Sequence, residues 1–127
     1  MIISTSELQQ LLVSKKERKN LVLIDVRRQD ELHNGMIPQA HHLPLYELEE
    51  ALNLNAKDFK KKYRFEQPDK KKLIIVYCRT GGRSHIAASL LRGLGYTAKN
   101  YKGSIWEWSE VDSSVRRYGS YDTVNIS

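Results

Sequence analysis

The sequence is poor in cysteine, with Cys78 alone among 127 residues. A single cysteine excludes a disulfide within the chain, a Cys-x-x-Cys redox pair and a zinc site built from several cysteines. Long hydrophobic runs are also missing, and the apolar stretches are too short to cross a bilayer. Residues 1–4 lack the basic region and long apolar stretch of a secretory signal. We therefore expect a cytoplasmic or mitochondrial protein, the latter after cleavage of a transit peptide from a longer precursor.

Negative charge is scarce, because 15 acidic residues face 21 lysines and arginines and the formal net charge is +6. Basic residues cluster at 15–19, 60–62 and 70–72. Such clusters can bind nucleic acid, but neither interleaved aromatic residues nor a recognisable nucleic-acid-binding module accompanies them. We interpret them as solvated helix faces and loop edges, and expect neither nucleic acid nor a membrane as partner. The net charge suits a small anionic substrate.

Strand-like and helix-like stretches alternate along the chain. The continuously apolar runs at 21–26 and 73–78 are short and typical of strands buried on both faces of a parallel sheet. Helical patterns include one at 84–94. The alternation predicts a single α/β domain over residues 1–127, with a mostly parallel central sheet flanked by helices. The polar tail from about residue 113 is expected to pack lightly.

Smaller elements are expected around these. Ser4 and Glu7 have the spacing of a capping box, in which a serine caps a helix and a glutamate reaches back to it. Residues 27–34 are expected to form a short helix and residues 98–101 a strand. Ser104 to Glu107 repeats the capping-box spacing before another short helix.

The cysteine opens a loop between a predicted strand and a predicted helix, and the loop is rich in glycine and arginine. It reads Cys78-Arg79-Thr80-Gly81-Gly82-Arg83-Ser84. Backbone amides converge at a helix N-terminus and stabilise an anion, and the glycines let successive amides turn inward. A free thiol has a pKa of about 8.5, so a nucleophilic cysteine needs such surroundings to ionise. We interpret this loop as an anion-binding site around a reactive thiolate, rather than around a buried structural cysteine.

Other polar residues are candidates for supporting roles. Arg79 and Arg83 can each hold an oxyanion through two parallel N–H groups. Asp25 and Arg27 follow a predicted strand and are expected to form an ion pair near the site. Trp106 is a candidate for the rim of the pocket. No metal is expected, because the histidines have no second cysteine or acidic cluster to complete a ligand set.

Three motifs, in order, resemble those of the rhodanese-like family, whose fold is a three-layer α/β sandwich. The loop that begins at Cys78 and has arginine at its sixth position resembles the family's active-site loop. The stretch 25–44 resembles its N-terminal signature, and 101–108 is similar to its C-terminal signature. Three departures, Met36 for histidine, and Gln39 and Ser104 for glycine, affect loop geometry rather than the nucleophile.

The resemblance implies a single-domain thiosulfate sulfurtransferase that needs no cofactor. Cys78 would take the outer sulfur of a small anionic donor such as thiosulfate, become a persulfide, and pass the sulfur to a thiol or cyanide. A protein persulfide also fits as a partner. The implied site comprises Cys78 as nucleophile and residues 79–84 as the substrate-binding loop.

Two alternatives remain open at this point. One is a non-catalytic rhodanese-type module that only binds a partner, which is weakened because inactive members commonly lose the cysteine. The other is a cysteine-dependent phosphatase or arsenate reductase. Related phosphatases have a loop one residue longer, whereas four residues separate Cys78 from Arg83 here, and the sequence identifies no general acid for the leaving oxygen.

Overall fold

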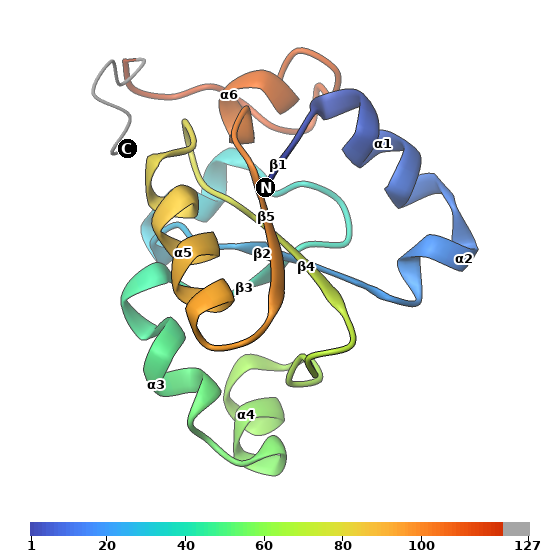
Figure 1. The fold of residues 1–127 in the computed structure, drawn as a ribbon. Coiled ribbons are helices and arrows are strands. Elements are labelled where there is room, and N and C mark those ends of the chain that lie inside the picture. The colour runs from blue at the N-terminus through green and yellow to red at the C-terminus, as the bar shows by residue number, and fades with distance from the viewer. Residues whose placement is uncertain (121–127) are drawn as a thin grey trace.

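A parallel β-sheet forms the centre of the protein in a computed structural model that describes residues 1–120 (Figure 1). Within these residues the sheet has five strands in the order β1-β5-β4-β2-β3, and each neighbouring pair is parallel. The strands are β1 Ile2–Ile3, β2 Leu21–Asp25, β3 His41–His42, β4 Leu73–Tyr77 and β5 Thr97–Tyr101. The predicted α/β class is confirmed.

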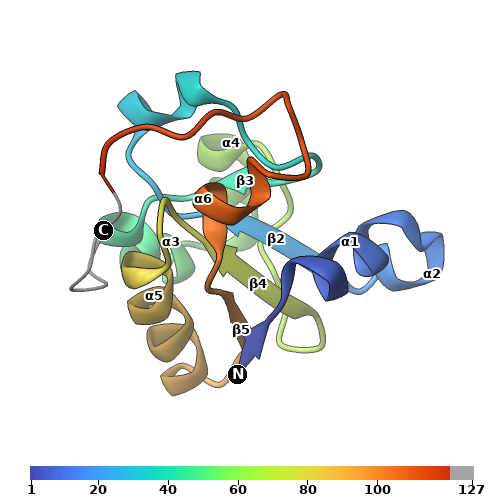
Figure 2. The same cartoon turned by 90° about the horizontal axis from the view of Figure 1, so that it is seen from above.

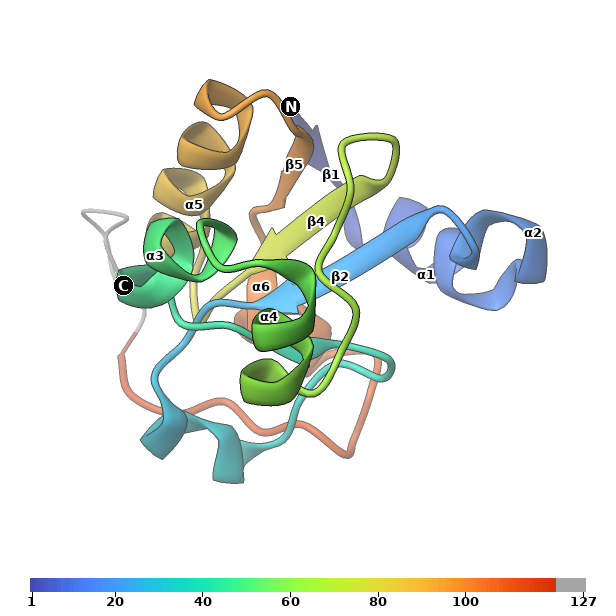
Figure 3. The same cartoon turned by 90° about the horizontal axis from the view of Figure 1, so that it is seen from below.

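Helices cover both faces of the sheet. They are α1 Thr5–Val13, α2 Lys15–Arg18, α3 Leu48–Leu52, α4 Ala56–Tyr63, α5 Gly82–Gly93 and α6 Ser104–Trp108, with 3-10 helices at η1 Gln29–Asn34 and η2 Leu45–Glu47. Helices α3, α4 and α5 lie on one side (Figure 3), and α1 and α6 lie on the other (Figure 2). None of the helices within residues 1–120 is long and apolar enough to cross a membrane.

Two hydrophobic cores result from the alternation of side chains along β4. Ile74 and Val76 face the core beneath α3, α4 and α5, while Ile75 and Tyr77 face the core beneath α1 and α6. All four side chains are fully buried. A strand that is apolar at every position is what burial on both faces requires, and this explains the continuous run in the sequence.

The sequence predicts the first helix cap correctly and the last one wrongly. At α1 the Ser4 hydroxyl accepts a hydrogen bond from the Glu7 amide, and the Glu7 carboxylate accepts one from the Ser4 amide. At α6 the N-cap is Gly103 and Ser104 is already inside the helix, with φ of +54°. The Ser104 hydroxyl instead donates to the Tyr101 carbonyl.

The segment 113–120 packs more closely than its polar composition predicts. Val115 is buried in the core beneath α1 and α6, and the Arg116 amide donates to the Asn34 carbonyl at 2.8 Å. In Figure 2 this segment, drawn in red, runs from α6 past η1 toward the N-terminal end of α5. Most side chains of residues 113–120 are exposed, as expected for a polar tail, but Val115 and the hydrogen bond from Arg116 hold the segment against the fold. Residues 121–127 lie outside the described part.

Candidate active site

Cys78 follows the last residue of β4, at the edge of the sheet where the parallel strands end. Helix α5 begins four residues later at Gly82, so residues 78–81 form the turn between strand and helix. Cys78 has no exposed surface. Its position is that of ligand sites in open α/β sheets, which lie outside the carboxyl ends of the strands.

Three polar groups approach the sulfur of Cys78. The Gly81 amide donates to Sγ at 3.1 Å, and the hydroxyl oxygens of Ser84 and Ser104 lie 3.4 Å and 4.0 Å away. Hydrogen bonds to an ionised group favour the ionised form, and the N-terminus of the 12-residue helix α5 adds positive potential. The arrangement stabilises a thiolate and, equally, an anionic sulfur attached to it.

Gly81 is required by the shape of this turn. Its φ is +105°, and a Cβ atom at this position would lie 2.4 Å from the Lys102 carbonyl oxygen. The Gly81 carbonyl accepts hydrogen bonds from the Asn100 amide group at 3.3 Å and from the Ser84 hydroxyl at 3.2 Å. These bonds hold the turn in place, so the Gly81 N–H stays directed at the sulfur.

The loop is also held from the opposite side by Ser104. The Cys78 amide donates to the Ser104 hydroxyl at 3.0 Å. Sequence reasoning considered Ser104 only as a departure from a glycine and as a helix cap. Its positive φ explains why glycine suits this position, and Gln39, the other such departure, also has a positive φ of +72°.

Arg83 forms a two-pronged ion pair with Glu31 of η1. Nη1 donates to Oε1 at 2.6 Å and Nη2 donates to Oε2 at 2.9 Å. Burial would raise the pKa of the Glu31 carboxyl, but hydrogen bonds from Arg83, the Arg28 amide and Tyr118 outweigh it and lower the pKa to about 2. Burial opposes the charge on Arg83, but Glu31 raises its pKa, as does the nearby Cys78 sulfur. Arg83 is thus a permanent cation near Cys78.

Arg79 contacts a different part of the molecule. Its Nη1 donates to the carbonyl oxygens of Tyr118 at 3.1 Å and Ser120 at 2.6 Å. The guanidinium also lies 5.7 Å from the centre of the Tyr118 ring. The two arginines of the loop are therefore not equivalent, since Arg83 meets a carboxylate and Arg79 meets main-chain carbonyls.

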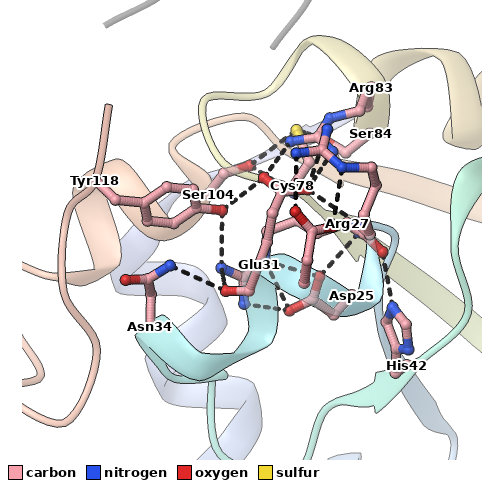
Figure 4. A network of polar contacts seen from close by, with 12 residues as sticks. Asp25, Arg27, Glu31, Asn34, His42, Cys78, Arg83, Ser84, Ser104 and Tyr118 are labelled. Atoms are coloured by element: carbon pink, nitrogen blue, oxygen red, sulfur yellow. Dashed lines mark hydrogen bonds and ion pairs between the residues drawn. The ribbon is translucent and has the colours of Figure 1, made fainter. Parts of the chain in front are cut away.

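Asp25 and Arg27 form the predicted ion pair, and both are fully buried (Figure 4). Arg27 donates from Nε at 3.0 Å and from Nη2 at 2.7 Å to the two carboxylate oxygens. Its Nη2 also donates to the Gly35 carbonyl at 2.8 Å, and its own carbonyl lies 2.7 Å from Nε2 of His42. The pair thereby ties the end of β2 to η1 and β3.

The remaining predicted residues lie around this centre. Thr80 and Gly82 are buried within the loop. Trp106 is half-buried, and the Arg117 guanidinium lies 4.7 Å from the centre of its ring. Residues 1–120 contain no group of three or more histidine, cysteine, aspartate or glutamate side chains placed to hold a metal ion.

Sequence reasoning missed Tyr118. Its hydroxyl donates to Glu31 Oε2 at 2.8 Å and accepts from Arg27 Nη1 at 3.0 Å. No sequence signal identifies this tyrosine, because it follows Arg83 by 35 positions and lies in a polar segment without periodicity.

The fold and the site define a class of protein: an α/β sandwich with a cysteine held in an anion-stabilising turn at the end of a central strand. The chain belongs to the rhodanese-like domain family, whose sequence model matches residues 5–111. The family resemblance of the three motifs is thereby confirmed.

Individual relatives agree with this assignment. The human thiosulfate:glutathione sulfurtransferase is 39% identical over 113 residues, which are 87% of this chain and 95% of that protein. A Schizosaccharomyces pombe protein, named as mitochondrial, is 44% identical over 93 residues, which are 72% of this chain and 66% of that protein. The solved structure of a human single-domain sulfurtransferase has a TM-score of 0.80 and 36% identity, covering 87% of this chain and 96% of that one.

Proposed function

We propose that the protein is a rhodanese-type sulfurtransferase that moves a sulfane sulfur from thiosulfate, or a related persulfide, to a thiol or cyanide. The observation that carries this proposal is the hydrogen bond that the Sγ atom of Cys78 accepts from the Gly81 amide at the N-terminus of α5. The names of the human relatives support the reaction class.

The reaction consists of two displacements at sulfur. The Cys78 thiolate attacks the outer sulfur of thiosulfate, the sulfur–sulfur bond of thiosulfate breaks, and its electron pair leaves with sulfite. The acceptor thiolate then attacks the outer sulfur of the Cys78 persulfide, and the electron pair of the breaking bond restores the Cys78 thiolate. Neither step consumes an oxidant, and sulfite needs no general acid because it leaves as a stable anion.

The loop residues have separate proposed roles. The Gly81 amide stabilises the charge on the reacting sulfur, and the Ser84 hydroxyl, which donates to the Gly81 carbonyl, holds that amide in place. Arg83 attracts the anionic sulfur donor, which competes with Glu31 for the guanidinium. Arg79 can reach such a donor only by leaving the carbonyls of residues 118 and 120.

The rest of the predicted site is assigned to shape and support. Thr80 and Gly82 shape the buried turn, and Asp25 with Arg27 supports it from the end of β2. Trp106, a half-buried residue of α6, is assigned to the rim of the substrate pocket. For location we propose the cytoplasm or mitochondria, and the name of the Schizosaccharomyces pombe relative supports the second of these.

Intact-mass measurement after incubation with thiosulfate tests the reaction. The wild-type protein should gain the mass of one sulfur atom and lose it again when cyanide or glutathione is added. Cys78→Ser should gain nothing. A wild-type protein that neither gains sulfur nor forms thiocyanate would contradict the proposal.

The same preparations separate the alternatives. Hydrolysis of an aryl phosphate that depends on Cys78 would indicate a phosphatase. A partner captured equally by wild type and Cys78→Ser, together with no turnover, would indicate a binding module. A panel of donors, including thiosulfate, glutathione persulfide and a protein persulfide, would identify the preferred sulfur donor by kcat/KM.

A further inference from the structure

Tyr118 lies among the charged side chains beside the Cys78 loop, although it comes from the C-terminal segment. Its half-buried ring has the guanidinium of Arg27 at 5.8 Å and that of Arg79 at 5.7 Å from its centre. The buried side chain of Val115 and the hydrogen bond from Arg116 to Asn34 fix the segment on which Tyr118 is carried. The ring is therefore held in place by contacts that do not depend on its hydroxyl.

The Tyr118 hydroxyl connects two ion pairs of different character. It accepts a hydrogen bond from Arg27, which is fully buried and held by Asp25. It donates to Glu31, whose carboxylate pairs with Arg83. A continuous chain of hydrogen-bonded side chains thus runs from the end of β2 through Tyr118 to the first turn of α5 (Figure 4).

The hydroxyl keeps its proton at neutral pH, so it acts on Glu31 only as a hydrogen-bond donor. Burial raises the pKa of Tyr118 to about 12; Arg27 opposes this rise and Glu31 adds to it. By donating to Oε2 at 2.8 Å, the hydroxyl fixes the carboxylate and takes up part of its charge. Less of that charge then remains to hold Arg83 away from an anionic substrate.

We propose that Tyr118 is a positioning residue for the anionic sulfur donor: its hydroxyl, anchored on Arg27, holds Glu31 so that Arg83 can share its guanidinium with the sulfur donor beside Cys78. This inference rests on the proposed sulfurtransferase function. It assigns Tyr118 to the first half-reaction, in which the sulfur donor binds, and not to transfer to the acceptor.

Tyr118→Phe is the appropriate variant, because it keeps the ring and removes only the hydroxyl. We expect kcat/KM for thiosulfate to fall by roughly threefold to tenfold, mainly through KM, because the lost hydrogen bond acts on the sulfur donor only indirectly, through Glu31 and Arg83. The kcat/KM for cyanide, which reports on the second half-reaction, should stay within about twofold of wild type. Tyr46→Phe is the matched control, since Tyr46 is exposed.

A double-mutant cycle with Glu31→Gln distinguishes positioning from general support of the fold. If the hydroxyl acts through the Glu31 carboxylate, Tyr118→Phe should have little further effect on thiosulfate kinetics in the Glu31→Gln background. Kinetics should be measured at a temperature where urea unfolding shows every variant to be folded.

Two outcomes would overturn the inference. One is an unchanged kcat/KM for thiosulfate in Tyr118→Phe, and the other is an equal loss in both half-reactions, which indicates general damage. Failure of the proposed function is separately visible, because wild type itself would then acquire no sulfur by intact mass, and the assignment of Tyr118 to sulfur-donor binding would fall with it.

Discussion

Glu31 and Arg83 form a bidentate ion pair near Cys78, and only 6% of the Glu31 side chain is exposed. A buried carboxylate stabilises a protein only when hydrogen bonds replace the water it loses. Glu31 receives such bonds from Arg83, from the Arg28 amide and from Tyr118. The positive charge of Arg83 near Cys78 is therefore neutralised by the Glu31 carboxylate. The contribution of this carboxylate to stability can be measured as a function of pH.

The Glu31 carboxylate should make the free energy of unfolding fall at acidic pH. Its pKa of about 2 in the folded protein lies below its ordinary value of 4.5, so its contribution is fully present above pH 4.5 and is lost as pH falls toward 2. Urea unfolding of Glu31→Gln should show a loss of up to about 3 kcal/mol at pH 7, and the difference from wild type should shrink below pH 4.5.

The control for this prediction is Glu66→Gln. Glu66 pairs with Lys60 on the surface, where 78% of its side chain is exposed. Exposed pairs contribute about 0–1 kcal/mol, so this variant should unfold almost as wild type does. A Glu31→Gln difference that stays constant from pH 7 to pH 3 would contradict the assigned role.

Single residues differ in how well the sequence predicts them. Cys78 and its turn could be predicted because strand, glycines and helix are adjacent in the chain. The partner of Arg83 could not, because an isolated glutamate or tyrosine carries no periodic pattern that shows which distant group it meets. Tyr118 lies at the site only because the C-terminal segment runs from α6 past η1, and no local sequence pattern predicts that course.

The elements next to the site were predicted to within one or two residues, since apolar runs and glycines mark where they end. Helix α5 begins at Gly82 rather than at Ser84, because Gly81 serves as the N-cap. The predicted cap of α6 at Ser104 was wrong. A serine caps a helix in this motif only when its backbone is extended, whereas the backbone of Ser104 is left-handed. Local spacing does not reveal that the Cys78 amide competes for this hydroxyl.

Two glycines of the α5 region should respond oppositely to alanine. Gly81→Ala forces a Cβ to within 2.4 Å of the Lys102 carbonyl at a φ of +105°, so we expect a loss of at least about 2 kcal/mol in unfolding free energy. Persulfide formation should be lost with it, because the Gly81 amide turns away from the sulfur.

Gly93→Ala is the matched control at the other end of the helix. A Cβ there meets no atom within 4 Å, so the protein should gain about 0.5–1 kcal/mol from helix propensity and keep its activity. Urea unfolding and intact mass measure both variants. An active, stable Gly81→Ala protein would contradict the described turn.

For the molecule as a whole, the sheet separates two cores, and the C-terminal segment completes one of them. The alternation of strands and helices predicted the parallel sheet and its cover on both faces. It did not predict closure by residues 113–120, because their composition is polar and the buried contact rests on a single valine, Val115.

Val115→Ala tests whether this segment belongs to the fold. Removing two buried carbon atoms should lower the free energy of unfolding by about 2 kcal/mol. Val111→Ala, at a position that is 50% exposed, should change it by less than about 0.5 kcal/mol. Equal stability of the two variants would mean that the segment is not held as described.

Cys78, the proposed nucleophile, has no exposed surface. A molecule in solution reaches the sulfur only during the fraction of time in which a neighbouring group moves aside, so the rate of reaction includes an opening equilibrium. Small sulfur compounds and bulky thiol reagents should then differ in rate far more than their intrinsic reactivity predicts. Restricted access of this kind would limit reaction of the Cys78 thiolate with larger electrophiles.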